Sequence, residues 1–226
     1  IKMQNVETIM FADQTITVDT SYLSHDSYWY WGTTSSNTYN TEDGNDVIDS
    51  GGGNDIIDGG TGDDTLLLFN NKADFEMVTL GGLTKIYGLD STGLGVAYAF
   101  DTIRMTYVEN IMFADQTITV DTATLSGDYY FGTLGNSYNI TGTDGDDVID
   151  SAGGRDDING AGGDDILMIF SDIANFEVIT LEGVTKIYGT TNVSGLGAVY
   201  YQDTIKTIGV ETVAFGGLFG ESDQNI

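Results

Sequence analysis

One large aliphatic residue recurs every nine positions in two stretches of the chain, each time two residues after an aspartate. These aliphatic residues are Ile48, Ile57 and Leu66 in the first stretch, and Ile149, Ile158 and Leu167 in the second. Glycine-rich polar segments separate them. A glycine-rich turn followed by one inward-facing apolar residue predicts very short strands joined by tight turns. A flexible Gly/Asp-rich linker would not keep its aliphatic residues in phase over six units.

Longer stretches of alternating polar and apolar residues predict further strands outside the nonapeptides. Residues 175–181 and 184–188 flank Glu182-Gly183 and predict a β-hairpin, and an equivalent hairpin is expected around Gly81-Gly82. Further strands are expected near residues 97–105 and 199–207. The segment VETIMFADQTITV predicts one or two strands. We find no convincing helix.

A second repeat has a period of 102 residues. The segment Val6–Thr20 returns as Val108–Thr122 with a single difference, Thr8 against Asn110, and a decayed copy begins at Val210. We therefore expect residues 1–20 to be a cap segment that completes or docks on a neighbouring module. Two modules are expected to follow at 21–122 and 123–226, with rolls at about 37–69 and 138–170. Near-identity of the copies and a start in mid-repeat indicate a piece of a longer array.

Charge and composition exclude several classes of function. The chain has 35 acidic and 7 basic residues, for a net charge of -28, so electrostatic binding to nucleic acid or to an anionic membrane is excluded. The chain has no cysteine. Its single histidine, His25, is expected at the surface. Because there is one histidine, a zinc site with several imidazoles is excluded. No apolar segment approaches the roughly 18 residues that a membrane span requires.

The two nonapeptide stretches resemble a known family. TEDGNDVIDSGGGNDIIDGGTGDDTLLL and TGTDGDDVIDSAGGRDDINGAGGDDILMI are similar to RTX (repeats-in-toxin) sequences, whose nonapeptide reads G-G-x-G-x-D-x-U-x. Gly59–Leu67 fits this pattern completely, and the other units replace one or both of the first glycines. The DTI…VExIxFADQT phrase also resembles the segment that follows RTX nonapeptides. The resemblance implies an all-β fold of two tandem short parallel β-rolls, each with a β-rich cap.

The resemblance also implies calcium between turns that stack on the same edge of a roll. Calcium takes six to eight oxygen ligands, which carboxylates and the carbonyls of glycine-rich turns supply. Loop 41–46 is expected to pair with loop 59–64, and loop 142–147 with loop 160–165. The middle loops, 50–55 and 151–156, must find partners in flanking segments. We expect several Ca²⁺ ions per chain, with one well-formed site per module.

The expected ligands fall into two groups. The carboxylates are those of Asp46, Asp55, Asp64, Asp147, Asp156 and Asp165. The loop residues expected to contribute carbonyls or further oxygens are Thr41, Asp43, Gly44, Ser50, Gly52, Gly53, Gly59, Thr61, Gly62, Gly142, Asp144, Gly145, Ser151, Gly153, Gly154, Gly160, Gly162 and Gly163. Arg155 departs from the usual small polar residue, and its charge is expected to weaken the middle site of the second module.

Calcium binding and folding are expected to be coupled. Stacked carboxylates repel one another without metal, and each nonapeptide buries one aliphatic side chain. That burial is too small to offset an ordering entropy of roughly 1–2 kcal/mol per residue. The rolls are therefore expected to be disordered until calcium binds.

Two other features allow more than one interpretation. The run Tyr28-Trp29-Tyr30-Trp31 is expected either to cover the open end of the roll as core or to form a stacking platform for sugars. Lys85 and Lys186 recur in the phrase TKIYG and are expected to be solvated.

These features favour an extracellular, calcium-binding structural or adhesive repeat protein, such as an adhesin, a surface-layer protein or a matrix filament. The resemblance implies type I secretion with folding triggered by external calcium, and the tandem modules suggest end-to-end assembly with like modules. The alternatives are a carbohydrate-binding module for a cell-surface glycan and the non-catalytic tail of a larger secreted enzyme. No catalytic motif is recognisable, so we do not expect an enzyme.

Overall fold

The computed structural model describes residues 8–10, 15–17, 28–89, 98–122, 128–132, 139–216 and 224–225. These residues form β-strands and three short 3₁₀ helices, η1 (Lys72–Asp74), η3 (Ile173–Asn175) and η4 (Gly195–Tyr200), without an α-helix among them. The prediction of an all-β fold is therefore confirmed. None of the described helices is long or apolar enough to cross a membrane. His25 lies outside the described residues.

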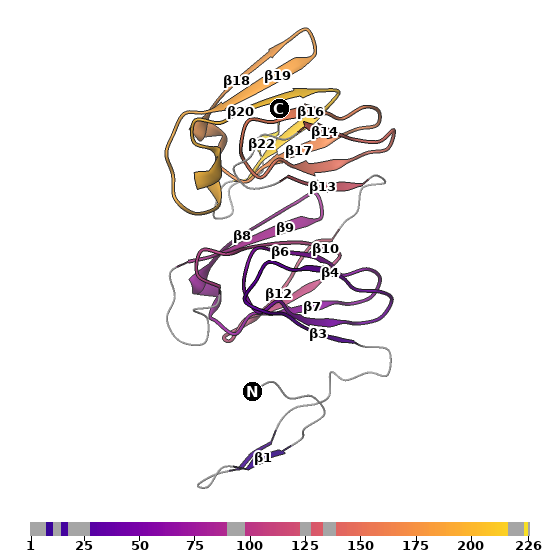
Figure 1. The fold of residues 1–226 in the computed structure, drawn as a ribbon, viewed down its shortest axis with the longest axis vertical. Coiled ribbons are helices and arrows are strands. Elements are labelled where there is room, and N and C mark those ends of the chain that lie inside the picture. The colour runs from indigo at the N-terminus through magenta and orange to yellow at the C-terminus, as the bar shows by residue number, and fades with distance from the viewer. Residues whose placement is uncertain are drawn as a thin grey trace.

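The first module consists of two five-stranded sheets, ordered β12-β11-β7-β5-β3 and β4-β6-β10-β9-β8 (Figure 1). Its strands are β3 (Trp29–Trp31), β4 (Thr38–Asn40), β5 (Val47–Asp49), β6 (Asp55–Asp58), β7 (Thr65–Leu67), β8 (Phe75–Leu80), β9 (Leu83–Gly88), β10 (Thr102–Thr106), β11 (Asn110–Met112) and β12 (Thr117–Thr119). The pairs within β3-β5-β7-β11 and β4-β6-β10 are parallel, whereas the hairpin β8-β9 and strand β12 add antiparallel edges.

The second module repeats this arrangement in the sheets β13-β15-β17-β21-β22 and β14-β16-β20-β19-β18. Its strands are β13 (Tyr129–Phe131), β14 (Asn139–Thr141), β15 (Val148–Asp150), β16 (Asp157–Asn159), β17 (Ile166–Ile169), β18 (Phe176–Leu181), β19 (Val184–Gly189), β20 (Thr204–Ile208), β21 (Thr212–Phe215) and β22 (Gln224–Asn225). Two further strands, β1 (Thr8–Met10) and β2 (Thr15–Thr17), pair antiparallel in the register of β11 and β12.

The nine-residue period places successive strands in alternate sheets, as a parallel roll requires. Strands β5 and β7 pair in one sheet, while β6, which lies between them in sequence, belongs to the other. The phased aliphatic residues Ile48, Ile57 and Leu66 are fully buried between the two sheets. The second loop position needs a left-handed backbone, which Gly60 supplies in the first module and Ala161 adopts in the second, with φ of 76° and 75°. The two tandem parallel rolls are thus present.

The hairpin predictions are confirmed, and two strand boundaries need correction. Strands β10 and β20 begin only at Thr102 and Thr204, because the residues before them turn instead of extending. In this turn Phe100 N–H donates to the Gly88 carbonyl. The turn leaves the side chain of Tyr98 buried in the core of the first module. The repeated VExIxF segments form two strands in β1-β2 and β11-β12, and one described strand, β21, before residue 217.

The two modules pack through the outer face of β9 and β10 against β13, β15 and β17 (Figure 1). Leu83, from β9, is fully buried in the hydrophobic core of the second module. Lys85 Nζ lies 3.0 Å from Asp150 Oδ2, and the Lys85 side chain is 1% exposed. Arg104 Nη1 donates to the Gly132 carbonyl over 2.7 Å. The expectation of a solvated Lys85 is therefore wrong, because the neighbouring module covers this hairpin, whereas Lys186 is exposed.

The same contact buries apolar side chains on the outside of the roll. Ile149 faces inward, so its neighbours Val148 and Asp150 face outward, yet all three are buried. Met168 is also fully buried. The expectation of one buried aliphatic residue per nonapeptide underestimates the core, since it considers each roll in isolation.

The Lys85–Asp150 pair gives a direct test of this packing. We expect Lys85→Ala to lower the free energy of unfolding by about 3–5 kcal/mol, because it leaves a buried carboxylate without its counter-charge. The equivalent exposed change, Lys186→Ala, should alter it by about 0.5 kcal/mol or less. Denaturant titration of both variants in saturating calcium at low protein concentration measures the difference. Equal effects would contradict the packing described.

Candidate calcium sites

A ladder of aspartates runs along one edge of the first roll. Tyr28 N–H donates to Asp46 Oδ1 over 2.8 Å, and Asp46 N–H donates to Asp64 Oδ1 over 2.7 Å. Asp64 N–H in turn donates to Glu109 Oε2 over 2.8 Å. Each carboxylate thus fastens the backbone one turn earlier, and Glu109 takes the place of an aspartate after the last turn.

The second roll has the same ladder. Asp128 N–H donates to Asp147 Oδ1 over 2.7 Å, and Asp147 N–H donates to Asp165 Oδ1 over 2.9 Å. Asp165 N–H donates to Glu211 Oε2 over 2.9 Å. The loops 41–46 and 59–64, and likewise 142–147 and 160–165, therefore lie side by side as predicted.

The middle loops pair with flanking segments on the opposite edge. Asn37 N–H donates to Asp55 Oδ1 over 2.8 Å, and Gly53 N–H donates to Asp101 Oδ2 over 2.7 Å. In the second module Gly154 N–H donates to Asp203 Oδ2 over 2.6 Å. Loop 50–55 thus lies between residues 36–37 and 101–102, as the sequence requires of a loop without a nonapeptide partner.

Four of the six predicted aspartates keep one buried carboxylate oxygen without a hydrogen-bond partner. These are the Oδ2 atoms of Asp46, Asp55, Asp64 and Asp165. A buried carboxylate oxygen without a partner is costly, and native proteins rarely leave one. A cation beside these oxygens removes that cost. The donor set, carboxylates and turn carbonyls, is the one that calcium prefers, so the residues present fit this ion.

Asp147 differs from these four aspartates. Its Oδ2 accepts hydrogen bonds from the backbone N–H and the side-chain hydroxyl of Thr143. The equivalent position in the first module is Glu42, which has no hydroxyl to donate. The carboxylate of Asp147 is therefore satisfied by its own loop.

Burial acts on the charge state of these carboxylates. It raises the pKa of Asp55 to about 7 and that of Asp64 to about 7, and it also raises the pKa of Asp165. Nearby carboxylates, such as Glu109 beside Asp64, add to the effect. Burial in low dielectric disfavours the charged form. A bound cation would favour it again.

The predicted turn carbonyls lie at the same edges. The Gly59 carbonyl accepts from the Thr41 hydroxyl, and the Thr61 carbonyl accepts from Gly44 N–H over 2.8 Å. Thr61 Oγ1 also donates to Asp43 Oδ1 over 2.7 Å. Among the glycines predicted as ligands, those with a positive φ are Gly44, Gly52, Gly53, Gly62, Gly153, Gly154 and Gly163.

Side chains alone do not make a metal cage. Among the described residues, no group of three or more His, Cys, Asp or Glu side chains is gathered to hold an ion. Ligation at these edges therefore depends on backbone carbonyls as well as on carboxylates, which suits calcium better than a transition metal.

The nonapeptide pattern did not identify the four carboxylates that complete the edges: Asp101, Asp203, Glu109 and Glu211. Each lies 45–49 residues from the loop residue that it contacts. The available signal was the recurrence of the DTI and VE phrases in both modules. Arg155 is exposed, and the weakening of the middle site by its charge stays a prediction.

Comparison with known families agrees with this geometry. Four copies of the RTX calcium-binding nonapeptide repeat match the chain, within residues 31–66 and 139–167. These ranges contain β4 to β6 and β14 to β16 and the loops at both edges of each roll. Both rolls therefore contain RTX calcium-binding nonapeptide repeats.

Among solved structures the chain matches the extracellular lipase LipA from Serratia marcescens at 13% identity and a TM-score of 0.23. The match covers 83% of this chain and 38% of the lipase chain. This likeness is too loose to carry an argument about function. No curated protein matches the chain.

The raised pKa values give a pH dependence to the metal-free protein. An aspartate whose pKa is raised on folding stabilises the fold below its unfolded pKa of about 3.8, and this stability is lost as the pH rises to about 7. In the presence of chelator we therefore expect the denaturant concentration at the unfolding midpoint to decrease as the pH is raised from about 4 to about 7. The double variant Asp55→Asn/Asp64→Asn should lose most of this dependence. A midpoint independent of pH in the unsubstituted protein would contradict the assignment.

Proposed function

We propose that this chain is an extracellular structural or adhesive repeat protein whose folding is controlled by calcium. The observation that carries the proposal is the set of buried, unpartnered aspartate oxygens at the turns of RTX repeats. A protein that must be exported unfolded and become rigid outside the cell has a use for such turns, since external calcium completes them only after export.

The ligands we propose lie in stacked loops. In the first module, Asp46 and Asp64 would bind calcium together with the carbonyls of Gly59 and Thr61, and Asp55 would do so at the opposite edge. In the second module, Asp165 and Asp156 take these roles, with the carbonyls of Gly160 and Gly162. The loop residues expected from the sequence remain part of this proposal. Bound calcium supplies the positive charge that the stacked carboxylates lack, and the chain supplies the oxygens and the turns.

Charge supports a role for calcium in folding. The net charge of -28 opposes compaction until cations bind, and because the chain has no cysteine, any covalent stapling by disulfides within it is excluded. Tandem modules that already stack through a buried ion pair suit a filament, a stalk or a surface layer. RTX repeats are structural calcium-binding elements, so we propose no catalytic activity for these residues.

One observation favours a second function, the binding of a glycan. Two residues of the aromatic run, Tyr28 and Trp31, are 60% and 37% exposed, whereas Tyr30 packs against the core of the first module. Trp29 and Trp31 stack with ring centroids 5.6 Å apart. Exposed aromatic faces of this kind can stack on sugar rings.

Removal of calcium tests the leading proposal. We expect chelation near pH 7.5 to convert the far-ultraviolet circular dichroism from sheet to coil, and millimolar calcium to restore it. Asp64→Asn should raise the calcium midpoint by about tenfold or more, whereas Asp63→Asn, an equal charge change on an exposed neighbour, should shift it by about twofold or less. An unchanged spectrum in chelator would be evidence against calcium-controlled folding.

Intrinsic fluorescence tests the glycan alternative. Both tryptophans lie in the aromatic run, so a bound sugar should shift their emission, and Trp31→Ala should abolish binding. Phe100→Ala, at an exposed aromatic residue elsewhere, should leave binding intact. No response to a broad glycan panel by the calcium-loaded protein would exclude this function.

A further inference from the structure

The outer face of the sheet β14-β16-β20-β19-β18 is equivalent to the face of the first module that the second module covers. Register identifies its residues. Asp157 pairs with Lys206, Lys206 with Lys186, and Ile208 with Val184, so these five side chains share one side of the sheet. We call this side the terminal face.

Side chains on the terminal face are more exposed than their equivalents on the face of the first module, which the second module covers. Leu83 is fully buried, whereas Val184 at the same position is 37% exposed. Thr106 is 4% exposed, and its equivalent Ile208 is 51% exposed. Ile179, Leu181 and Tyr188 add further exposed apolar surface to the hairpin β18-β19. Contiguous apolar surface on a sheet face marks an interaction site.

The distribution of positive charge supports the same conclusion. Only seven residues in the chain are basic, and four of them lie on these two faces: Lys85, Arg104, Lys186 and Lys206. Lys85 is the register partner of Arg104, as Lys186 is of Lys206. Two like charges side by side on a sheet are unfavourable unless an anion faces them. In the covered face the anion is Asp150 of the next module, whereas on the terminal face Asp157 of the same sheet pairs with Lys206, beside Lys186.

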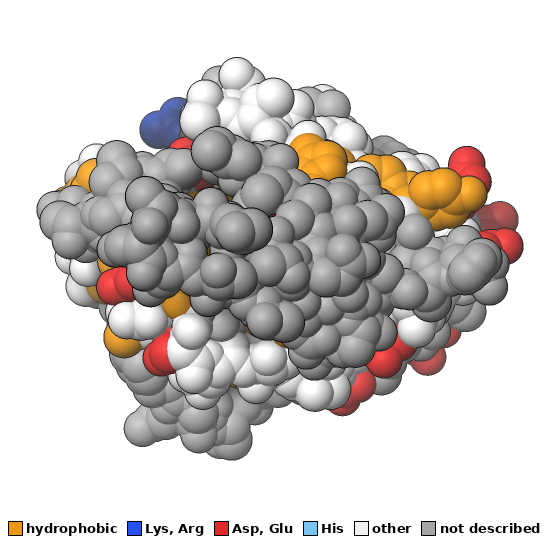
Figure 2. Space-filling view, turned by 90° about the horizontal axis from the view of Figure 1, so that it is seen from below, with side chains coloured by type: hydrophobic (Ala, Val, Ile, Leu, Met, Phe, Trp, Pro, Cys, Tyr) orange, Lys and Arg blue, Asp and Glu red, His pale blue; other side chains and the backbone are white. Residues whose placement is uncertain are grey.

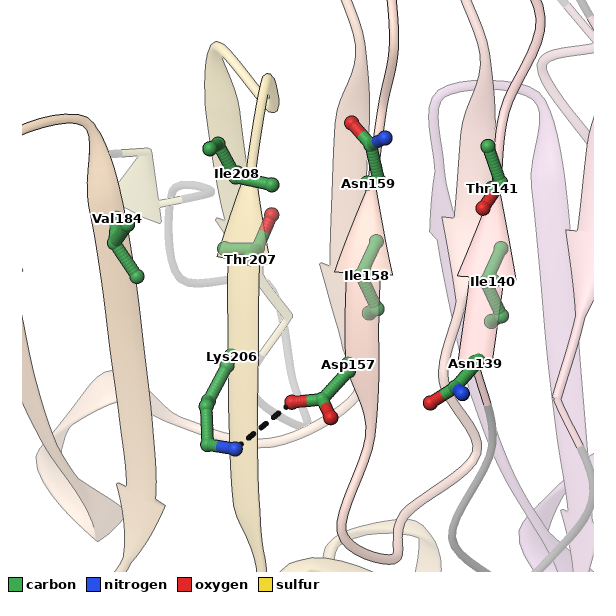
Figure 3. Close-up of a pocket in the computed structure, with 10 residues that line it drawn as sticks. All are labelled: Asn139, Ile140, Thr141, Asp157, Ile158, Asn159, Val184, Lys206, Thr207 and Ile208. Carbon is green, nitrogen blue, oxygen red and sulfur yellow. Dashed lines mark hydrogen bonds and ion pairs between the residues drawn. The ribbon is translucent and has the colours of Figure 1, made fainter.

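The terminal face also has a hollow that can receive side chains. A hollow of about 370 Å³ lies over β14, β16, β19 and β20. Figure 3 shows Lys206 and Asp157 joined by their ion pair on one side of it, with Ile208 and Asn159 on the other. The outward residues of β14 and β16 are polar, and the apolar part of the face lies on β18, β19 and β20.

We propose that the terminal face docks the first module of a second copy of this chain, in the arrangement by which the second module docks on the first. The proposal rests on the proposed function, since it identifies the surface through which a calcium-loaded array would grow. The incoming surface is the sheet β12-β11-β7-β5-β3. Because the two surfaces differ, the contact is heterologous, and repeating the arrangement of the two modules extends the assembly head to tail.

The residues of the incoming sheet match those that the covered face already binds. Asp49 occupies the repeat position of Asp150, and Trp31 that of Phe131, over which the Arg104 guanidinium lies at 5.6 Å. Figure 2 views this end of the chain and shows acidic and hydrophobic side chains at the margins of its described surface. Asp49 is 5% exposed in the single chain. Its Oδ1 accepts from the Tyr98 hydroxyl of the same module at 3.5 Å, so docking competes with this contact and the association depends on concentration.

Sedimentation velocity of the full chain in millimolar calcium, from about 1 to about 500 µM, tests the proposal. We expect the mass to rise with concentration beyond a dimer. The emission of Trp29 and Trp31 should shift in parallel, because both lie on β3 of the incoming sheet. Lys186→Glu/Ile208→Glu should remain monomeric, whereas Tyr201→Glu, at an exposed residue outside the sheet, should assemble normally.

Two results would overturn the docking proposal. A calcium-folded chain that stays monomeric over the whole range would show that the terminal face does not bind a second copy. Assembly that stops at a dimer without a tryptophan shift would show that the contact is not head-to-tail. Circular dichroism on the same samples separates these results from failure of calcium-controlled folding, which would instead appear as a spectrum insensitive to chelator.

Discussion

Burial of carboxylates without a counter-charge is the constraint on which the whole structure depends. The nine-residue period brings aspartates to the turns, and the roll buries them with one oxygen fastened to the backbone and the other without a partner. The fastened oxygen fixes the spacing of successive turns. The other oxygen is buried without a partner, which destabilises the stacked roll unless a cation binds beside it. The same aspartates thus define the spacing of the turns and make the stability of the roll depend on a bound cation.

The stacking of modules follows from a different interaction. Each roll is narrow, and the apolar residues between its two sheets are few. The outer faces therefore contribute to the core: Leu83 lies in the hydrophobic cluster of the second module, and Lys85 reaches Asp150 across the boundary. Stability is shared between neighbours, as in other repeat architectures. Four of the seven basic residues of this acidic chain lie on the two equivalent sheet faces, one of which makes this contact.

Sequence reasoning recovered the features that depend on local periodicity. The strands of both rolls, the hairpins β8-β9 and β18-β19 and the pairing of edge loops all follow from the phase of glycine, aspartate and aliphatic residues. It failed where distant segments decide the outcome. The burial of Lys85 depends on a module that begins some 40 residues later, and Glu109 reaches Asp64 from the cap. The Asp147 carboxylate is satisfied within its own loop by the backbone N–H and hydroxyl of Thr143, and the nonapeptide pattern gives no sign of these contacts.

The most direct test of the central claim is a crystal structure of the calcium-loaded chain with anomalous scattering from the metal. The account predicts ions within about 2.3–2.6 Å of the Oδ2 atoms of Asp64 and Asp165, each ion also coordinated by turn carbonyls of a stacked loop. Anomalous density absent from both edges, in a crystal whose turns are nevertheless stacked and whose aspartate oxygens contact only water, would contradict it.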